Sequence, residues 1–285
     1  MTMLEKRMRG LNADLSATVA KVADHDAAAN AVHRLRTTIR RIESLVSYVN
    51  PDLDKKLERS LERMADLRKL AGKVRDIDVQ ADLLKNLGNG SSAKDRETLG
   101  VVLEKKRKRQ AKRLESVVKK IQRSKFFVRM DGIAEQAGVL QDGRNRPLAP
   151  LEEARAQLAE MAGGFASRQT MKPSQMHEAR VTLKRIRYLA ELAEETFEQK
   201  NFIRDLKSVQ DAIGDWHDWQ ELTRAAEKRF SDRVNCVLLR EARTVLSARN
   251  SDATSSINRL FTLARAPSRK PPRSAQPLRT SARSA

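Results

Sequence analysis

Aromatic side chains are scarce in this sequence, where phenylalanine, tryptophan and tyrosine together make up 4% of 285 residues. Sheet cores usually recruit aromatic and β-branched side chains, so their scarcity argues against a β protein. We therefore predict an all-α fold. Cysteine is nearly absent as well, since Cys236 is the one cysteine. A single cysteine excludes an internal disulfide framework and a cysteine-rich zinc site, and it favours a reducing compartment.

Long apolar runs and catalytic signatures are also missing. No apolar stretch approaches the roughly 18 residues that a membrane-spanning helix needs, and the N-terminal MTMLEKRMRG lacks the apolar core of a signal peptide. We therefore expect a cytoplasmic protein with no membrane partner. The sequence has no G-x-x-x-x-G-K-[ST] loop, no H-E-x-x-H pair and no nucleophile with an evident base. We expect no enzymatic activity, no cofactor and no metal.

Positive charge, by contrast, is abundant. The chain has 57 lysines and arginines against 37 aspartates and glutamates, which gives a formal net charge of +20. A charge of this size exceeds what solubility requires and creates a field that attracts polyanions. The composition therefore indicates a nucleic acid, an anionic membrane or a phosphate polymer as the partner.

Apolar residues recur at helical spacing along most of the chain, and clusters of glycine, proline and asparagine interrupt them. The pattern predicts helices over residues 3–24, 27–49, 53–72, 76–87, 95–125, 150–162, 173–198, 200–213, 216–230 and 233–263, with a further short helix ending at residue 137. We predict one domain over residues 1–263, divided into halves at 1–140 and 145–263. Residues 264–285 are rich in proline and basic side chains with little to bury, so we predict a disordered tail.

An internal repeat relates the two halves. A shift of 144 residues lays HRLRTTIRRIESL, from His33, over HEARVTLKRIRYL, from His177. Arg36 then meets Arg180, Arg40 meets Lys184 and Arg41 meets Arg185. A weaker match joins LAGKVRDIDV to QDAIGDWHDW, in two registers that fit about equally well. The chain therefore resembles two related helical bundles in tandem.

The spacing of the repeated residues places them on one face of each helix. At about 100° per residue, His33, Arg36 and Arg40 form a row beside an apolar stripe, and His177, Arg180, Lys184 and Arg187 form the corresponding row. At 1.5 Å per residue the first row covers roughly 10 Å, which suits several successive phosphates. Arginine gives phosphoryl oxygens bidentate donors and lysine a point charge. The alternative is a solvated basic face with packing histidines, and repetition of the pattern argues against it.

Other polar residues carry weaker hypotheses. Asp76 and Asp78 resemble a paired-carboxylate metal site, but further ligands are missing, so a helix-cap role beside Arg75 is favoured. We expect Trp216 and Trp219 to pack near a helix start. We treat His25 and His217 as structural. The basic segment 105–125 is either a second contact strip or a solvated face.

The duplicated H-x-x-R-x-x-x-[RK], with VRDIDV after the first copy and KRIRYLAEL within the second, resembles the conserved histidine α-helical domain (CHAD) family over residues 5–263. The resemblance implies two pseudo-symmetric antiparallel helical bundles whose basic helices face a shared central cleft or pore. It also implies binding of inorganic polyphosphate and association with polyphosphate granules. The resulting candidate binding residues are His33, Arg36, Arg40, Arg41, His177, Arg180, Lys184, Arg185 and Arg187.

One position departs from the family pattern. Family members commonly place a further basic residue where Arg187 stands in the second copy, but the first copy has Glu43 there. Glu43 either repels phosphate or braces Arg36 or Arg40. We predict non-catalytic polyphosphate binding. The alternatives are a nucleic-acid-binding protein, whose lack of stacking aromatics counts against it, and, less favoured, a phosphohydrolase, which needs a metal held by carboxylates.

Overall fold

The computed structural model describes residues 1–24, 27–49, 54–87, 93–142, 149–165, 171–231 and 236–265. The described residues form helices and no strand, which confirms the all-α prediction. In chain order these helices are α1 (Met3–Asp24), α2 (Ala29–Val49), α3 (Lys55–Lys85), α4 (Ala93–Gln122), α5 (Phe126–Asp142), α6 (Pro150–Gly163), α7 (Pro173–Ala190), α8 (Phe197–Arg229) and α9 (Val237–Arg265). Among them, none has the length and apolar content to cross a bilayer.

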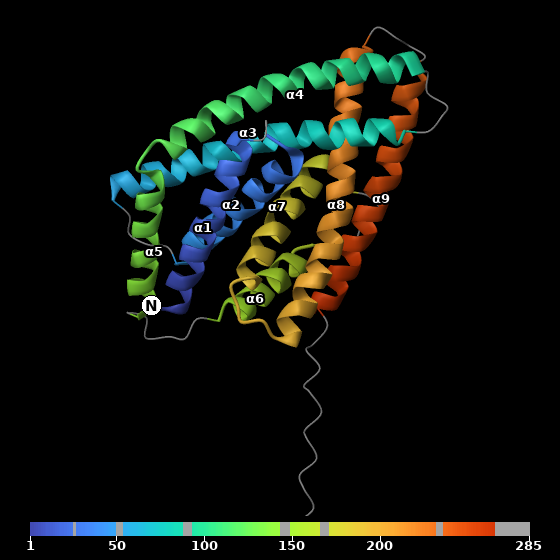
Figure 1. The fold of residues 1–285 in the computed structure, drawn as a ribbon. Coiled ribbons are helices and arrows are strands. Elements are labelled where there is room, and N and C mark those ends of the chain that lie inside the picture. The colour runs from blue at the N-terminus through green and yellow to red at the C-terminus, as the bar shows by residue number, and fades with distance from the viewer. Residues whose placement is uncertain are drawn as a thin grey trace, which may run out of the picture.

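The helices that carry the repeated sequences lie next to each other. In the first half α2 packs on α1 and α3, and in the second half α7 packs on α6 and α8. Across the middle of the molecule α2 contacts α7, and α3 contacts α8. The long helices α3 and α4 run side by side across one end of the molecule, where they reach α8 (Figure 1). Each repeated helix therefore faces its own counterpart.

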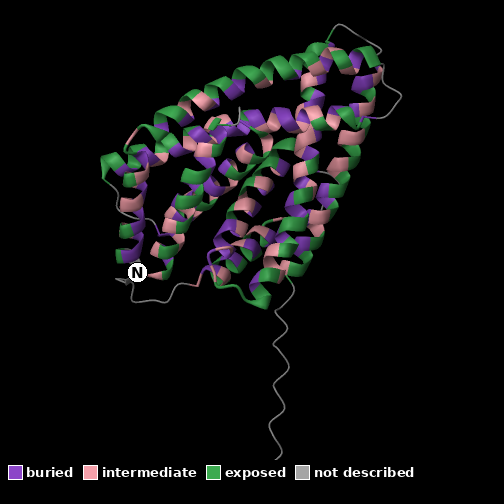
Figure 2. Cartoon of the chain, viewed as in Figure 1, coloured by how far each residue is buried: buried purple, intermediate pink, exposed green. Residues whose placement is uncertain are grey.

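Two hydrophobic cores join the halves. The larger core includes Leu35 of α2 and Leu183 of α7, which are both fully buried. The smaller core joins Ile77 of α3 to Leu222 and Trp219 of α8. Purple buried stripes on the inner sides of the helices mark these cores in Figure 2. Each core thus contains side chains from both halves of the chain.

Two predicted helix breaks are wrong. Helix α3 runs without interruption through Gly72, and α8 runs through Gly214. A glycine inside a helix costs only about 1 kcal/mol relative to alanine, and the packing of a long buried face outweighs that. Conversely, α7 ends at Ala190, before the predicted end at residue 198, and Thr196 caps α8 by accepting a hydrogen bond from the Gln199 amide at 3.1 Å.

The positions of two tryptophans in α8 and of the end of α9 differ from those predicted. Trp216 and Trp219 are 2% and 8% exposed, which confirms their packing role, but they lie in the middle of α8 and not near its start. Helix α9 continues to Arg265, two residues into the predicted tail. The rest of that tail, residues 266–285, and His25 lie outside the described residues.

Candidate anion-binding site

Helix α2 presents the first basic row beside its buried stripe. Leu35 and Ile39 are fully buried in the core and fix the rotation of the helix. The row on the neighbouring face begins with an exposed His33 and continues with half-buried Arg36 and Arg40. The predicted arrangement of apolar and basic faces on this helix is confirmed.

Helix α7 presents the second row in the same way. Leu183 is fully buried, His177 is exposed, and Arg180 and Lys184 are half-buried. The Arg187 side chain is 15% exposed. The cations toward the C-terminal end of this row have therefore lost much of their water.

The two rows meet where α2 contacts α7. Burial, followed by the positive charges of Arg180 and Arg40, lowers the pKa of Lys184 from 10.5 to about 6. Burial is also the main cause that lowers the pKa of Arg40, whose cationic neighbours include Arg36 and Arg180. Neither Lys184 nor Arg40 forms an ion pair with another described residue. The meeting point therefore brings together several cationic side chains, two of which have no carboxylate partner among the described residues.

Arg180 adds an unsatisfied donor to this cluster. Its Nε is buried and has no hydrogen-bond partner among the described residues. Burial lowers the Arg180 pKa, and the charge of Asp218 opposes that change. Because an unpaired buried donor costs free energy, a bound anion that accepts this hydrogen bond is stabilised.

Carboxylates on α3 and α8 lie behind the cations. Asp76 Oδ1 accepts a hydrogen bond from Arg36 Nη1 at 3.2 Å. Burial raises the pKa of Asp218 to about 6, although the charge of Arg180 acts in the opposite direction. Each central arginine thus has an aspartate on the next helix of its own half. Arg36 forms an ion pair with Asp76, whereas Asp218 acts on Arg180 as a nearby charge without an ion pair.

The comparisons with known proteins give the family. A sequence model of the CHAD domain matches residues 9–227. This chain belongs to the CHAD family. Its fold is similar to the crystal structure of the CHAD domain from the plant Ricinus communis, with a TM-score of 0.66, 15% sequence identity, and coverage of 91% of this chain and 90% of that one.

A second structure with a similar fold is PptA from Streptomyces chartreusis. The TM-score is 0.56 at 17% sequence identity, and the match covers 92% of this chain and 97% of PptA. No curated protein sequence matches the chain. The two structural matches, at these identities, establish the fold.

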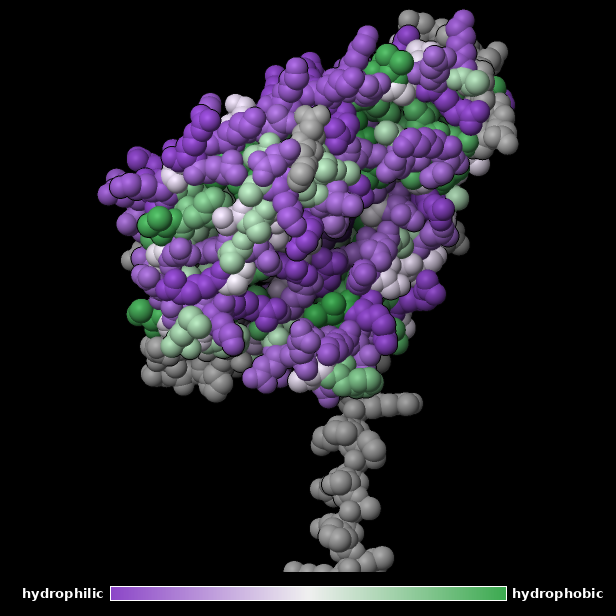
Figure 3. Space-filling view, viewed as in Figure 1, coloured by the Kyte–Doolittle hydropathy of each residue, from purple (hydrophilic) through white to green (hydrophobic). Residues whose placement is uncertain are grey.

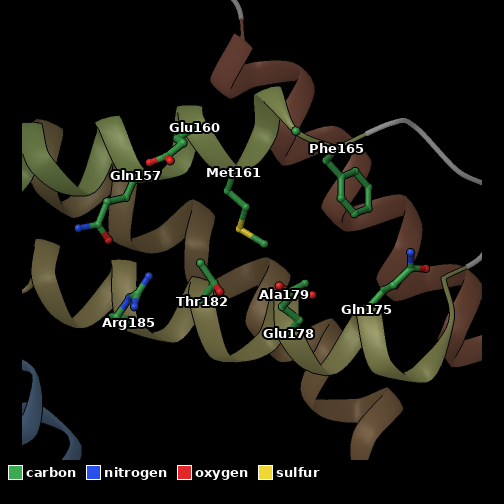
Figure 4. A pocket seen from close by; sticks show the side chains of 10 residues that line it. Gln157, Glu160, Met161, Phe165, Gln175, Glu178, Ala179, Thr182 and Arg185 are labelled. Atoms are coloured by element: carbon green, nitrogen blue, oxygen red, sulfur yellow. The ribbon is translucent and has the colours of Figure 1, made fainter.

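Two of the predicted site residues of this CHAD chain, Arg41 and Arg185, lie off the two rows, although Arg41 shares the Glu191 carboxylate with Arg187. Arg41 is exposed, and its Nε donates to Glu191 Oε2 at 2.9 Å. Arg185 lines a pocket of about 480 Å³ between α6 and α7, together with Gln157 and Glu160 (Figure 4). The other seven predicted residues, by contrast, lie on the rows that α2 and α7 bring together.

Glu43, the residue that departs from the CHAD pattern, braces neither Arg36 nor Arg40. Its Oε2 lies 2.8 Å from Nε of Arg68 on α3. At the corresponding position in the second half, Arg187 Nε lies 3.3 Å from Glu191 Oε1. Glu43 on α2 therefore pairs with an arginine of the neighbouring helix α3, and not with an arginine of its own row.

The predicted cap role of Asp76 and Asp78 is wrong. Both residues lie well inside α3, because that helix passes through Gly72. Asp78 accepts a hydrogen bond from Arg107 of α4 at 2.6 Å, so it fastens α4 to α3. Within the described residues, no three histidine, cysteine, aspartate or glutamate side chains group closely enough to hold a metal ion.

Sequence reasoning missed the contributions of α3 and α8. His217, predicted to be structural, faces Arg180 and Lys184, and burial followed by their charges lowers its pKa to about 3. Partial burial, followed by the charge of Arg75, lowers the pKa of His33. The weak match between LAGKVRDIDV and QDAIGDWHDW indicated these two helices, but its uncertain register did not single out His217.

Proposed function

We propose that this CHAD chain binds inorganic polyphosphate without turning it over, and that binding brings it to polyphosphate granules in the cytoplasm. The observation that carries the proposal is Lys184, half-buried among arginines with a pKa lowered to about 6 and no ion pair with a described residue. A protein keeps such a cluster at a cost in stability, so the cluster is best explained by an anion that neutralises it.

The chemistry of the cluster suits a chain of phosphates. Arg36, Arg40 and Arg180 offer charge-assisted donors from two helices that meet. The row on α2 extends over roughly 10 Å, so several successive phosphates contact it at once. Long chains bind better than short ones, because further phosphates engage without a second encounter.

The first experiment measures affinity for polyphosphates of graded length and for orthophosphate at fixed ionic strength. The proposal predicts affinity that rises with chain length and falls steeply as salt increases, since binding releases counterions. Equal affinity for orthophosphate and long chains contradicts it. The same series with Arg36→Ala and Arg180→Ala, each checked for folding by circular dichroism, tests whether both halves contribute.

Two further readouts separate the alternatives. Competition between polyphosphate and single-stranded DNA or RNA, matched in phosphate concentration, decides the ligand of the central cluster. Preference for nucleic acid at this cluster reverses the proposal. Phosphate release from polyphosphate across a panel of divalent metals tests the phosphohydrolase alternative, and we expect none above the rate without protein.

A further inference from the structure

Helix α4 carries a second concentration of positive charge on its outer face. Its exposed side runs along the upper edge of the molecule, which is green in Figure 2 and strongly hydrophilic in Figure 3. We call this surface the outer strip. Its exposed cations are Lys105, Lys106, Arg109, Lys112, Arg113, Lys119 and Lys120, and Arg123 follows directly after the helix.

The outer strip differs from an ordinary solvated helix face in its lack of ion pairs. None of its cations forms a salt bridge with another described residue, whereas Lys108 beside it pairs with Glu104 at 2.7 Å. Lys105, Arg109, Lys112 and Lys119 lie 4, 3 and 7 residues apart, so they form one line about 21 Å long on α4. A linear array of this length, free of acidic partners, matches an extended polyanion.

Grooves with aliphatic floors flank the outer strip on both sides. Between α4 and α8 lies a pocket of about 580 Å³, whose lining includes Lys105 and Arg109 of α4, Lys228 and Arg229 of α8, and the aliphatic Val102. Between α3 and α4 lies a pocket of about 680 Å³. It is lined by Arg63, Asp66, Lys69, Leu70, Lys73, Val117, Lys120, Ile121 and Ser124. The grooves thus combine cationic rims with patches of carbon.

The outer strip is separate from the central cluster. Helix α4 packs on α3, and α3 in turn packs on α2. Arg107 of α4 turns inward, where it donates to Asp78 at 2.6 Å and to the Ala27 carbonyl at 3.0 Å. These contacts fix the rotation of α4, which leaves the outer strip exposed.

We propose that the outer strip binds the phosphate backbone of double-stranded nucleic acid, without regard to base sequence. Exposed cations bind such a backbone through counterion release. The aliphatic floors favour it over polyphosphate, because sugars present carbon to them and polyphosphate has none. Neither the outer strip nor its two grooves contains an aromatic residue, which favours a duplex over single strands that need stacking.

The test compares binding of a DNA duplex of arbitrary sequence with binding of a short polyphosphate, by fluorescence anisotropy over a salt series. In the outer variant, Lys105→Gln, Arg109→Gln and Lys112→Gln are combined. We expect its duplex affinity to fall about tenfold and its salt slope to fall by about 3, because three phosphate contacts are lost. Its affinity for polyphosphate is expected to stay within about twofold, because these contacts belong to the duplex surface.

The matched control removes the same charge elsewhere, by combining Arg204→Gln, Lys207→Gln and Arg259→Gln, which are exposed residues on α8 and α9. We expect this control and Arg180→Ala to leave the salt slope for duplex unchanged. Equal loss in the outer variant and the control shows a general charge effect and overturns the proposal. A parallel loss of polyphosphate binding in the outer variant overturns it in favour of a second polyphosphate surface. Either result leaves the function proposed for the central cluster to its own test.

Discussion

The two halves of this CHAD chain carry the same basic pattern in different electrostatic settings. In the first half Arg36 pairs with Asp76, at 3.2 Å. In the second half Arg180 has no ion pair with a described residue, and its buried Nε has no hydrogen-bond partner there. The same arginine in the repeated motif is thus partly neutralised on α2 and left charged and unsatisfied on α7.

The difference extends along both rows. The position of Glu43 in the first half corresponds to that of Arg187 in the second, and the half-buried Lys184 stands where the first half has Arg40. The second row therefore has one cation more than the first, at the position of Arg187, whereas Lys184, with a pKa lowered to about 6, is largely neutral near pH 7. Repetition of a motif sets which donors are present, whereas the packing around each copy sets how strongly each donor attracts an anion. We expect the second half to supply more of the affinity for polyphosphate.

The largest expected effect comes from Arg180→Ala. A charged donor to phosphate contributes about 2 kcal/mol, so the loss of polyphosphate affinity is about 30-fold. The matched change in the first half combines Arg36→Ala with Asp76→Asn, so that both members of the ion pair lose their charge. We expect about a fivefold loss of polyphosphate affinity, because Asp76 already neutralises part of the Arg36 charge. Titration calorimetry with one long polyphosphate measures both. If the first-half change lowers polyphosphate affinity as much as Arg180→Ala or more, the second half does not supply the larger share of the affinity.

A pH series sharpens the role of Lys184. Its pKa is lowered to about 6 in the free protein, and bound phosphate favours its charged form and raises that pKa. Binding therefore takes up about one proton above pH 6, so wild-type affinity falls as pH rises, by up to about tenfold per unit between pH 7 and 9. In Lys184→Met we expect one proton fewer to be taken up.

Calorimetry in buffers of different ionisation heat measures that proton uptake directly. Protons taken up by the polyphosphate itself are common to both proteins and cancel in the difference. Identical uptake by the wild-type protein and Lys184→Met would show that Lys184 keeps its charge in the free protein.

Glu43→Gln makes the first half more like the second. It frees Arg68 from a partly exposed ion pair of 2.8 Å, and because such pairs contribute at most about 1 kcal/mol, polyphosphate affinity should rise only about threefold. Glu191→Gln is the matched change in the second half, since Glu191 pairs with Arg187. A fall in affinity for Glu43→Gln, measured at the same salt concentration, would mean that its ion pair positions Arg68 for binding.

The smallest expected effect concerns the glycines inside the long helices. A methyl group on Gly214 meets nothing within 4 Å, whereas one on Gly72 lies 3.8 Å from Arg36 Cζ, an ordinary contact. Each alanine substitution should raise stability by about 0.5–1 kcal/mol in urea denaturation, because alanine is the better helix former. Gly214→Ala should leave polyphosphate affinity unchanged. Destabilisation by this change would contradict an uninterrupted α8.

The sequence predicted the parts of the fold and site that depend on short-range spacing. Helical periodicity located α2 and α7, and the repeat predicted that His33 and His177 begin equivalent rows. It did not predict contacts between helices, such as the Glu43 pair with Arg68 or the approach of His217 to Arg180. These contacts depend on the angles and positions at which the long helices cross. The predicted lengths of α3 and α8 were wrong because each helix continues through a glycine, Gly72 in α3 and Gly214 in α8.

A crystal structure of the chain with a bound polyphosphate tests the central claim most directly. The account predicts successive phosphates within hydrogen-bond distance of Arg40, Arg180 and Lys184, with Arg180 Nε donating to one of them. Phosphates bound at Arg41, at Arg185 or along the outer strip, with the cluster between α2 and α7 empty, would contradict it.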